Sequence, residues 1–155
     1  MTTVEFKSKS VWENKFRTPT IEQLRDLYPK PVQQLWDESR EAIMALGDVR
    51  EELCWLGVPW RWSLVYRFGP DNAVLAYLVP QPIKPRLAAP MPPEAYMKMS
   101  ARKLSKYIRE GLLHAPAVGA IRWSSWELTA KTQLDEVMVM VRSRKDTATP
   151  VGAAS

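Results

Sequence analysis

The chain has little of the side-chain chemistry on which metal centres and disulfide frameworks depend. Among its 155 residues there is one cysteine, Cys54, and one histidine, His114. A single cysteine excludes an internal disulfide. With one cysteine and one histidine, metal sites built from several such side chains are excluded as well. The scarcity of these groups also argues against most hydrolase chemistry, so we predict no catalytic residue.

Long apolar runs are also absent. No run approaches the ~18 residues needed to cross a bilayer, and residues 1–10 lack the apolar core of a secretory signal. The hydrophobic share of 46% and the charged share of 25% are typical of one folded domain. We therefore expect a cytoplasmic protein that has no membrane partner.

The charge is unevenly distributed along the chain. Residues 1–60 carry 8 basic and 10 acidic side chains, whereas residues 61–155 carry 14 and 7, which gives a net charge of +5. Such an excess permits attraction to polyanions but does not demonstrate it, and a solvated basic face explains it equally well.

Two helices are predicted in the first third of the chain. Thr18, Pro19 and Thr20 precede a helical apolar spacing and have the chemistry of a helix start; this first helix is short because Pro29 follows. A second apolar stripe runs over residues 31–46, and Gly47 stands where a left-handed residue would end the helix.

From residue 51 the hydrophobic period changes from 3.6 to 2, which indicates strands. We predict a short strand at residues 53–56 and two longer strands at residues 60–68 and 73–79. The tight turn at residues 69–72 makes the two longer strands antiparallel. Residues 81–90 contain three prolines, which predict an edge strand or an extended loop.

The rest of the chain predicts a long helix, a strand and a last helix. The long helix begins at Pro92-Pro93, and Gly111 and Pro116 bracket its end. Its apolar stripe is formed by Met97, Ala101, Leu104, Ile108 and Leu112. A strand follows at residues 121–128, and Thr129 and Thr132 can cap the last helix. Residues 137–141 match a strand as well as a helix, and acidic residues in the first turn favour the helix.

These elements together predict an α+β fold. We expect a single antiparallel sheet of four to five strands flanked by helices, in the order helix, helix, strands, helix, strand, helix. Residues 1–17 are expected to form an irregular arm, residues 18–145 one domain and residues 146–155 a disordered tail.

Several segments give the chain a family resemblance. They are the bend Gly57-Val58-Pro59-Trp60, the hairpin at residues 62–79, the strand that begins Ile121-Arg122-Trp123 and the closing helix with its basic end at residues 141–145. Over residues 19–145 the chain resembles the YdhG-like superfamily of small bacterial domains of unknown function. The resemblance implies an antiparallel sheet flanked by helices and no catalytic residue. One branch is described as a frataxin-like iron chaperone.

Aromatic side chains are the most unusual feature of the composition, with 7 Trp and 5 Tyr. A concave sheet lined with them could hold a small apolar or planar ligand, with arginine supplying a charged contact. The alternative is an ordinary aromatic core, because strands favour these residues. The candidate pocket residues are Trp55, Trp60, Arg61, Trp62, Tyr66, Arg67, Arg122, Trp123 and Trp126.

Glu38 and Glu41 are one helical turn apart and form a weak candidate for iron, which favours hard oxygen ligands. Arg40 and Arg50 are interleaved with the acidic residues and the chain is cationic, so we predict no metal site and no cofactor.

Basic residues on the long helix form a weak candidate for binding a polyanion. They recur at i, i+4, i+8 and i+11, opposite the apolar stripe, and are Lys98, Arg102, Lys106 and Arg109. A solvated helix face is the simpler interpretation, so nucleic acid is not an expected partner.

The sequence therefore favours a noncatalytic domain, monomeric or homodimeric, that binds a small ligand or a protein. Two alternatives stay open. The resemblance implies an iron-handling chaperone, and an enzyme site could be assembled from scattered residues such as Glu52, Arg61, Tyr66 and Arg122.

Overall fold

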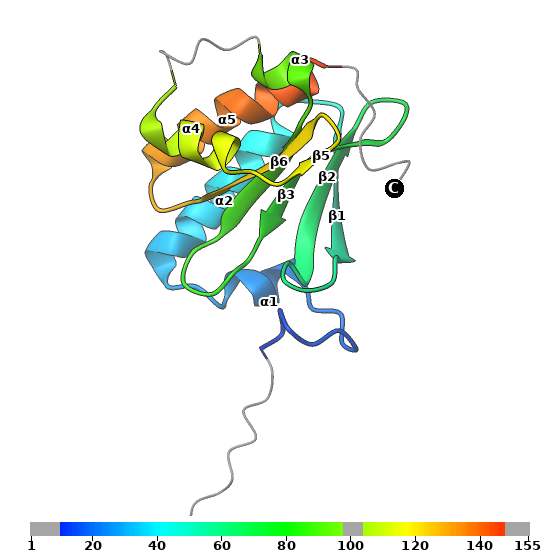
Figure 1. The fold of residues 1–155 in the computed structure, drawn as a ribbon. Helices are drawn as coiled ribbons and strands as arrows, with labels where there is room; N and C mark the ends of the chain where they lie inside the picture. The colour runs from blue at the N-terminus through cyan, green and yellow to red at the C-terminus, as the bar shows by residue number, and fades with distance from the viewer. Residues whose placement is uncertain (1–9, 98–103, 148–155) are drawn as a thin grey trace, which may run out of the picture.

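The computed structural model describes residues 10–97 and 104–147. Within them the chain forms five helices and six strands, and Figure 1 shows their arrangement. The elements in chain order are α1 (Ile21–Arg25), α2 (Lys30–Met44), β1 (Val49–Trp55), β2 (Trp62–Phe68), β3 (Ala73–Val79), β4 (Arg86–Met91), α3 (Pro93–Tyr96), α4 (Lys106–Leu113), β5 (Ala117–Val118), β6 (Ile121–Glu127) and α5 (Lys131–Lys145).

The strands form one sheet in the order β1-β2-β3-β4-β6-β5, and every neighbouring pair is antiparallel. This confirms the predicted α+β class with an antiparallel sheet. The sheet has six strands rather than the predicted four to five, because β5 forms a tight hairpin with β6. A strand of two residues is too short to produce a period-2 signal in the sequence.

The prediction of an edge strand or loop at residues 81–90 was wrong. Strand β4 lies in the interior of the sheet, between β3 and β6. On the β3 side only Arg86, Leu87 and Ala88 are paired, whereas Pro90 lies beyond that stretch, opposite Trp123 of β6. The missing N–H of the proline is therefore not required by the β3–β4 ladder.

The predicted single long helix was also wrong. Helix α3 ends at Tyr96, and α4 begins with a cap of its own, because the Oγ atom of Ser105 accepts a hydrogen bond from the backbone N–H of Ile108 at 3.3 Å. The predicted apolar stripe therefore does not follow one continuous helix. Its member Ala101 lies outside the described residues.

The first two helices were predicted correctly. Thr20 caps α1 in a reciprocal capping box with Gln23, and Gly47 has the positive φ of 80° expected after α2. The helix interpretation of residues 137–141 is confirmed as well. Helix α5 begins after Ala130, which makes no side-chain cap, so the expected caps from Thr129 and Thr132 are not formed.

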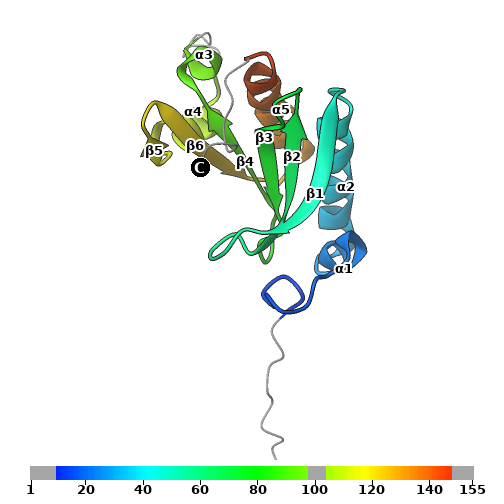
Figure 2. The same ribbon diagram turned by 90° about the vertical axis from the view of Figure 1, so that its right-hand side faces the viewer.

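Helices α2, α4 and α5 all pack on one face of the sheet, where the main core lies (Figure 2). Alternate residues of β2 point into that core, and the antiparallel register continues the same face across β3, β4 and β6 through the row Leu64, Leu78, Leu87 and Trp126. We refer to this side as the helix face and to the opposite side as the open face.

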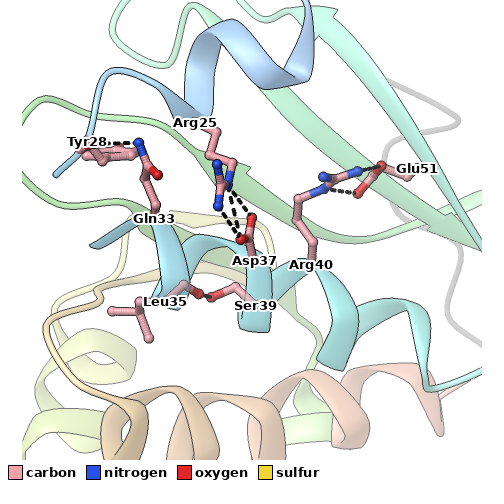
Figure 3. Close-up of polar contacts among 8 residues, drawn as sticks. All are labelled: Arg25, Tyr28, Gln33, Leu35, Asp37, Ser39, Arg40 and Glu51. Carbon is pink, nitrogen blue, oxygen red and sulfur yellow. Dashed lines mark hydrogen bonds and ion pairs between the residues drawn. The ribbon is translucent and has the colours of Figure 1, made fainter. Parts of the chain in front are cut away.

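Helix α2 is fixed to its neighbours by two ion pairs, which Figure 3 shows. Asp37 accepts two hydrogen bonds from the Nε and Nη2 atoms of Arg25 in α1, at 3.0 and 2.9 Å. Arg40 donates to both carboxylate oxygens of Glu51 in β1, at 3.0 and 2.7 Å. Bidentate pairs of this kind fix orientation as well as distance.

The chain ends differ in how they contact the domain. Residues 10–17 contain no helix or strand, but Trp12 is buried and its Nε1 atom donates to the carbonyl of Trp60 at 3.1 Å. At the other end Asp146 caps α5 and Thr147 is buried. Residues 1–9 and 148–155 lie outside the described residues.

Candidate functional site

The nine candidate pocket residues do not form one pocket, because the structure distributes them over different sides of the sheet. Trp62, Tyr66 and Trp126 lie in the main core. The Nε1 atom of Trp126 donates to the carbonyl of Ile108 in α4 at 3.2 Å. The structure thus places these three residues in an aromatic core and not around a pocket.

The open face carries a second group of aromatic rings. Tyr77 of β3 and Trp123 of β6 belong to this face by register, and Trp60 reaches it from the β1–β2 loop. The ring centroids of Trp60 and Tyr77 are 5.0 Å apart, and those of Tyr77 and Trp123 are 6.0 Å apart. We call these three half-buried rings the aromatic row. In the described part of the chain no helix covers it (Figure 2).

Two arginines border the aromatic row. Arg67 of β2 shares the open face and lies 4.0 Å from a carboxylate oxygen of Glu52. Arg86 of β4 donates to the Oγ atom of Ser125 at 3.0 Å and lies 4.0 Å from Glu127. Both ion pairs are at the limit of contact, so each guanidinium retains donors for another acceptor.

Tyr77 is the member of this site that sequence reasoning missed. It stands in a strand that is apolar on both faces, so nothing local marked it. Burial raises the pKa of its hydroxyl, while the charge of Arg67 acts in the opposite direction. The hydroxyl is therefore protonated at neutral pH and can donate a hydrogen bond.

Trp55 and Arg61 lie at one end of the sheet, beside the N-terminal segment. They line a groove of about 350 Å³ that we call the sheet-end groove; its residues are Glu13, Asn14, Lys15, Phe16, Trp55, Val58 and Arg61. The guanidinium of Arg61 pairs with Glu13 at 2.9 Å and lies 5.0 Å from the ring centroid of Trp12.

Arg122 belongs to neither the aromatic row nor the sheet-end groove. It pairs by register with Met91 on the helix face, donates to the carbonyl of Leu112 at 3.4 Å and lies over the ring of Tyr96. The scattered enzyme residues are equally dispersed. Glu52 is on the open face, Tyr66 is in the core and Arg122 is near α4, so the structure does not bring them together.

The acidic residues of α2 are engaged mainly in local contacts. Glu38 accepts a hydrogen bond from the side chain of Gln34 at 3.0 Å, and Glu41 is exposed. Asp37 of α2 is paired with Arg25, and Glu51 of β1 is paired with Arg40, as Figure 3 shows. Among residues 10–97 and 104–147 no group of three or more His, Cys, Asp or Glu side chains is arranged to hold a metal ion.

The basic stripe is only partly described. Lys98 and Arg102 lie outside the described residues, whereas Lys106 and Arg109 are exposed on α4. Lys106 is 3.8 Å from Glu110, one turn further along the same helix. Because α4 begins at Lys106, the four residues do not follow one continuous helix as predicted.

The single cysteine and histidine have ordinary structural positions. Cys54 is half-buried in β1; burial raises the pKa of its thiol to about 11, and the neighbouring Glu52 acts in the same direction. His114 is exposed at the C-terminal end of α4.

No protein-family model, curated protein or solved structure matches this chain. The resemblance to the YdhG-like superfamily therefore stays a prediction. No helix in the described part of the chain has the length and apolar character needed to cross a membrane.

Proposed function

We propose that this chain is a noncatalytic binding domain whose open sheet face binds a small planar molecule that carries an anionic group. The observation that carries the proposal is the aromatic row. Three rings from a loop, β3 and β6 meet on a face that no helix of the described residues covers, and Arg67 stands beside them. The proposal retains the cytoplasmic location and the YdhG-like relationship expected from the sequence.

The two parts of the site would recognise different parts of the ligand. An aromatic pair in offset or tilted contact contributes about 0.5–1.5 kcal/mol beyond burial of its area, so the row favours a flat apolar body. The guanidinium of Arg67 and the neutral hydroxyl of Tyr77 are donors, which favours an acceptor with negative charge at the edge of that body.

The iron-handling and enzyme alternatives remain predictions of the sequence. No observation in the described residues favours either of them over ligand binding, and the resemblance that suggests iron has no support from the comparisons.

The proposal can be tested with a pair of probes of equal shape. 2-Naphthoate is a planar anion, and 2-naphthylmethanol is its neutral counterpart. At about 0.3 kcal/mol for each of about 13 non-hydrogen atoms, 2-naphthoate should bind with a Kd of about 1 mM, which NMR titration measures.

Three variants separate the contributions to binding. Arg67→Gln should weaken 2-naphthoate about tenfold and leave 2-naphthylmethanol unchanged, because about 1.4 kcal/mol of charge-assisted contact is lost. Trp123→Leu should weaken both probes. Trp55→Leu, which changes a tryptophan outside the row, is the matched control and should weaken neither. Absence of binding, or binding that survives both Arg67→Gln and Trp123→Leu, would refute the proposal.

A further inference from the structure

The loop between β3 and β4 presents an exposed apolar side chain from a strained backbone. The backbone N–H of Lys84 donates to the carbonyl of Pro82 at 2.9 Å, and the residue between them, Ile83, has a φ of 76°. This is a γ-turn of the rare kind, and a β-branched residue is a genuine outlier there. The side chain of Ile83 is 79% exposed.

The surrounding structure holds this strained turn in place. The carbonyl of Gln81 accepts a hydrogen bond from the Tyr28 hydroxyl at 2.5 Å, and its side chain accepts one from Arg86 at 3.2 Å. The carbonyl of Pro85 accepts from the backbone of Leu128 at 2.9 Å. Prolines at positions 80, 82 and 85 restrict the loop further. Ile83 is therefore displayed on a rigid support and loses little conformational freedom on binding.

The sheet-end groove opens at the same end of the sheet. Because β1 to β4 run alternately up and down, the β1–β2 and β3–β4 loops lie at one end, together with α1 and the N-terminal segment (Figure 1). Phe16 and Val58, which line the groove, are 93% and 75% exposed. A protruding apolar residue and an apolar groove thus occupy one end of the same chain.

We propose that the chain forms a two-fold dimer through this end, in which Ile83 of each copy enters the sheet-end groove of the other. A two-fold axis through a surface that carries both Ile83 and the sheet-end groove gives two equivalent contacts, so the assembly stops at the dimer. The charged groups around this end also favour a second copy. Lys15, Arg17 and Lys84 lie on these segments with Glu22 and Asp26, and a set with both signs lets opposite charges meet across a two-fold axis, whereas an anionic lipid surface would repel the two carboxylates.

Sedimentation equilibrium of the full chain tests the dimer directly. Between about 1 and 200 µM chain, the fraction of dimer should rise with concentration, as mass action requires. Ile83→Asp and Val58→Asp should each give a monomer throughout this range. Val118→Asp is the matched control, because Val118 is 68% exposed on β5, away from these loops, and this variant should still dimerise.

Mixing the two monomeric variants gives a sharper test of the geometry. In a mixed pair, the intact Ile83 of the Val58→Asp chain meets the intact groove of the Ile83→Asp chain. One of the two contacts is restored, so an equimolar mixture should contain dimer where neither variant alone does.

A third variant separates loss of the contact from loss of the fold. Ile83→Gly removes the side chain and also relieves the strain, because glycine adopts positive φ readily. This variant should be monomeric, with a Tm about 2–4 °C above that of monomeric Ile83→Asp.

Three results would overturn the proposal: a wild-type chain that is monomeric throughout, equal dissociation by Val118→Asp, or a variant mixture that remains monomeric. If the wild type does not self-associate but sediments with phosphatidylcholine–phosphatidylglycerol vesicles, and Ile83→Asp does not, the surface binds lipid and the dimer is wrong. None of these measurements involves the aromatic row, so the dimer and the proposed ligand site can fail independently.

Discussion

Tyr66 donates its phenolic hydrogen to the Oε2 atom of Glu51 at 2.7 Å, across the β1–β2 pair. Arg40 of α2 donates to both oxygens of the same carboxylate. Burial by itself would raise the pKa of Glu51, but the hydrogen bonds from Arg40 and Tyr66 outweigh it and hold that pKa below its usual value. One carboxylate thus joins helix α2 to the first two strands.

Glu51→Gln should lower the free energy of unfolding by about 2 kcal/mol at neutral pH, because the amide cannot replace charge-assisted bonds to the arginine. A carboxylate whose pKa is lowered by folding stabilises the protein above its unfolded pKa, and this contribution is lost as the pH falls through the folded value. The difference between wild type and variant should therefore shrink from about pH 7 to about pH 3 in urea titrations. Glu41→Gln, an exposed change on the same helix, should show neither effect. A difference that does not vary with pH would contradict this account.

Gly111→Ala should destabilise the protein, although alanine is normally the better helix former by about 1 kcal/mol. A Cβ atom at this position would lie 2.1 Å from the Nε1 atom of Trp126, where β6 packs against α4. Overpacking of this kind costs about 1–3 kcal/mol, which denaturant titration resolves. Arg109→Ala, on the exposed side of the same helix, provides the comparison and should change stability little. If Gly111→Ala raised stability, the close packing of α4 on Trp126 would be wrong.

Cys54 should react slowly with a disulfide reagent such as Ellman's reagent in the folded protein. Burial raises the pKa of its thiol from 9.0 to about 11, and only the thiolate attacks. At about pH 8 the reactive fraction should be roughly 100-fold below that of an ordinary thiol. Unfolding in guanidinium should restore the ordinary rate, and equal rates in folded and unfolded protein would rule out the raised pKa.

Arg144 is fully buried; burial lowers the pKa of its guanidinium to about 10, and the charge of Glu94 acts in the opposite direction. Its Nε atom donates to the carbonyl of Val74 at 3.1 Å, and its Nη1 atom donates to Thr147 at 3.0 Å. Arg144→Lys should lower the free energy of unfolding by about 1–3 kcal/mol. The lysine ammonium keeps the buried charge but cannot form the hydrogen bonds that the planar guanidinium makes. Arg144→Met should cost less, because it removes the charge as well. Urea titration of both variants tests this order, with exposed Arg142→Lys as the control.

Local signals in the sequence were sufficient for much of the fold. The Thr20 cap, the position of Gly47 and the turn at residues 69–72 each depend on a few adjacent residues, and all three were predicted correctly. Strand β4 was predicted at an edge of the sheet, but its interior position depends on pairing with β6, which is distant in the chain. The break between α3 and α4 was missed because an apolar stripe at helical spacing continues across it.

The candidate site was harder to predict for a related reason. Alternation along a strand shows which residues share a face, but it does not show which face the helices will cover. Trp60 and Trp62 are only two residues apart, yet the structure places one in the aromatic row and the other in the core. Tyr77 and Trp123 come together only through the register of β3, β4 and β6, and a single sequence does not contain that register.

The position of β6 beside β4 also has a consequence for the order in which the chain folds. Strands β1 to β4 are joined by short connections and can form as successive hairpins, whereas β6 begins at Ile121, roughly 30 residues after β4 ends at Met91. Closing this long segment costs more chain entropy than closing the hairpins and is therefore slower. We expect β6 to pair with β4 late in folding. Trp123 arrives with β6, so the aromatic row is completed only at the end of folding, and a ligand bound there would select the finished molecule over every partly folded one.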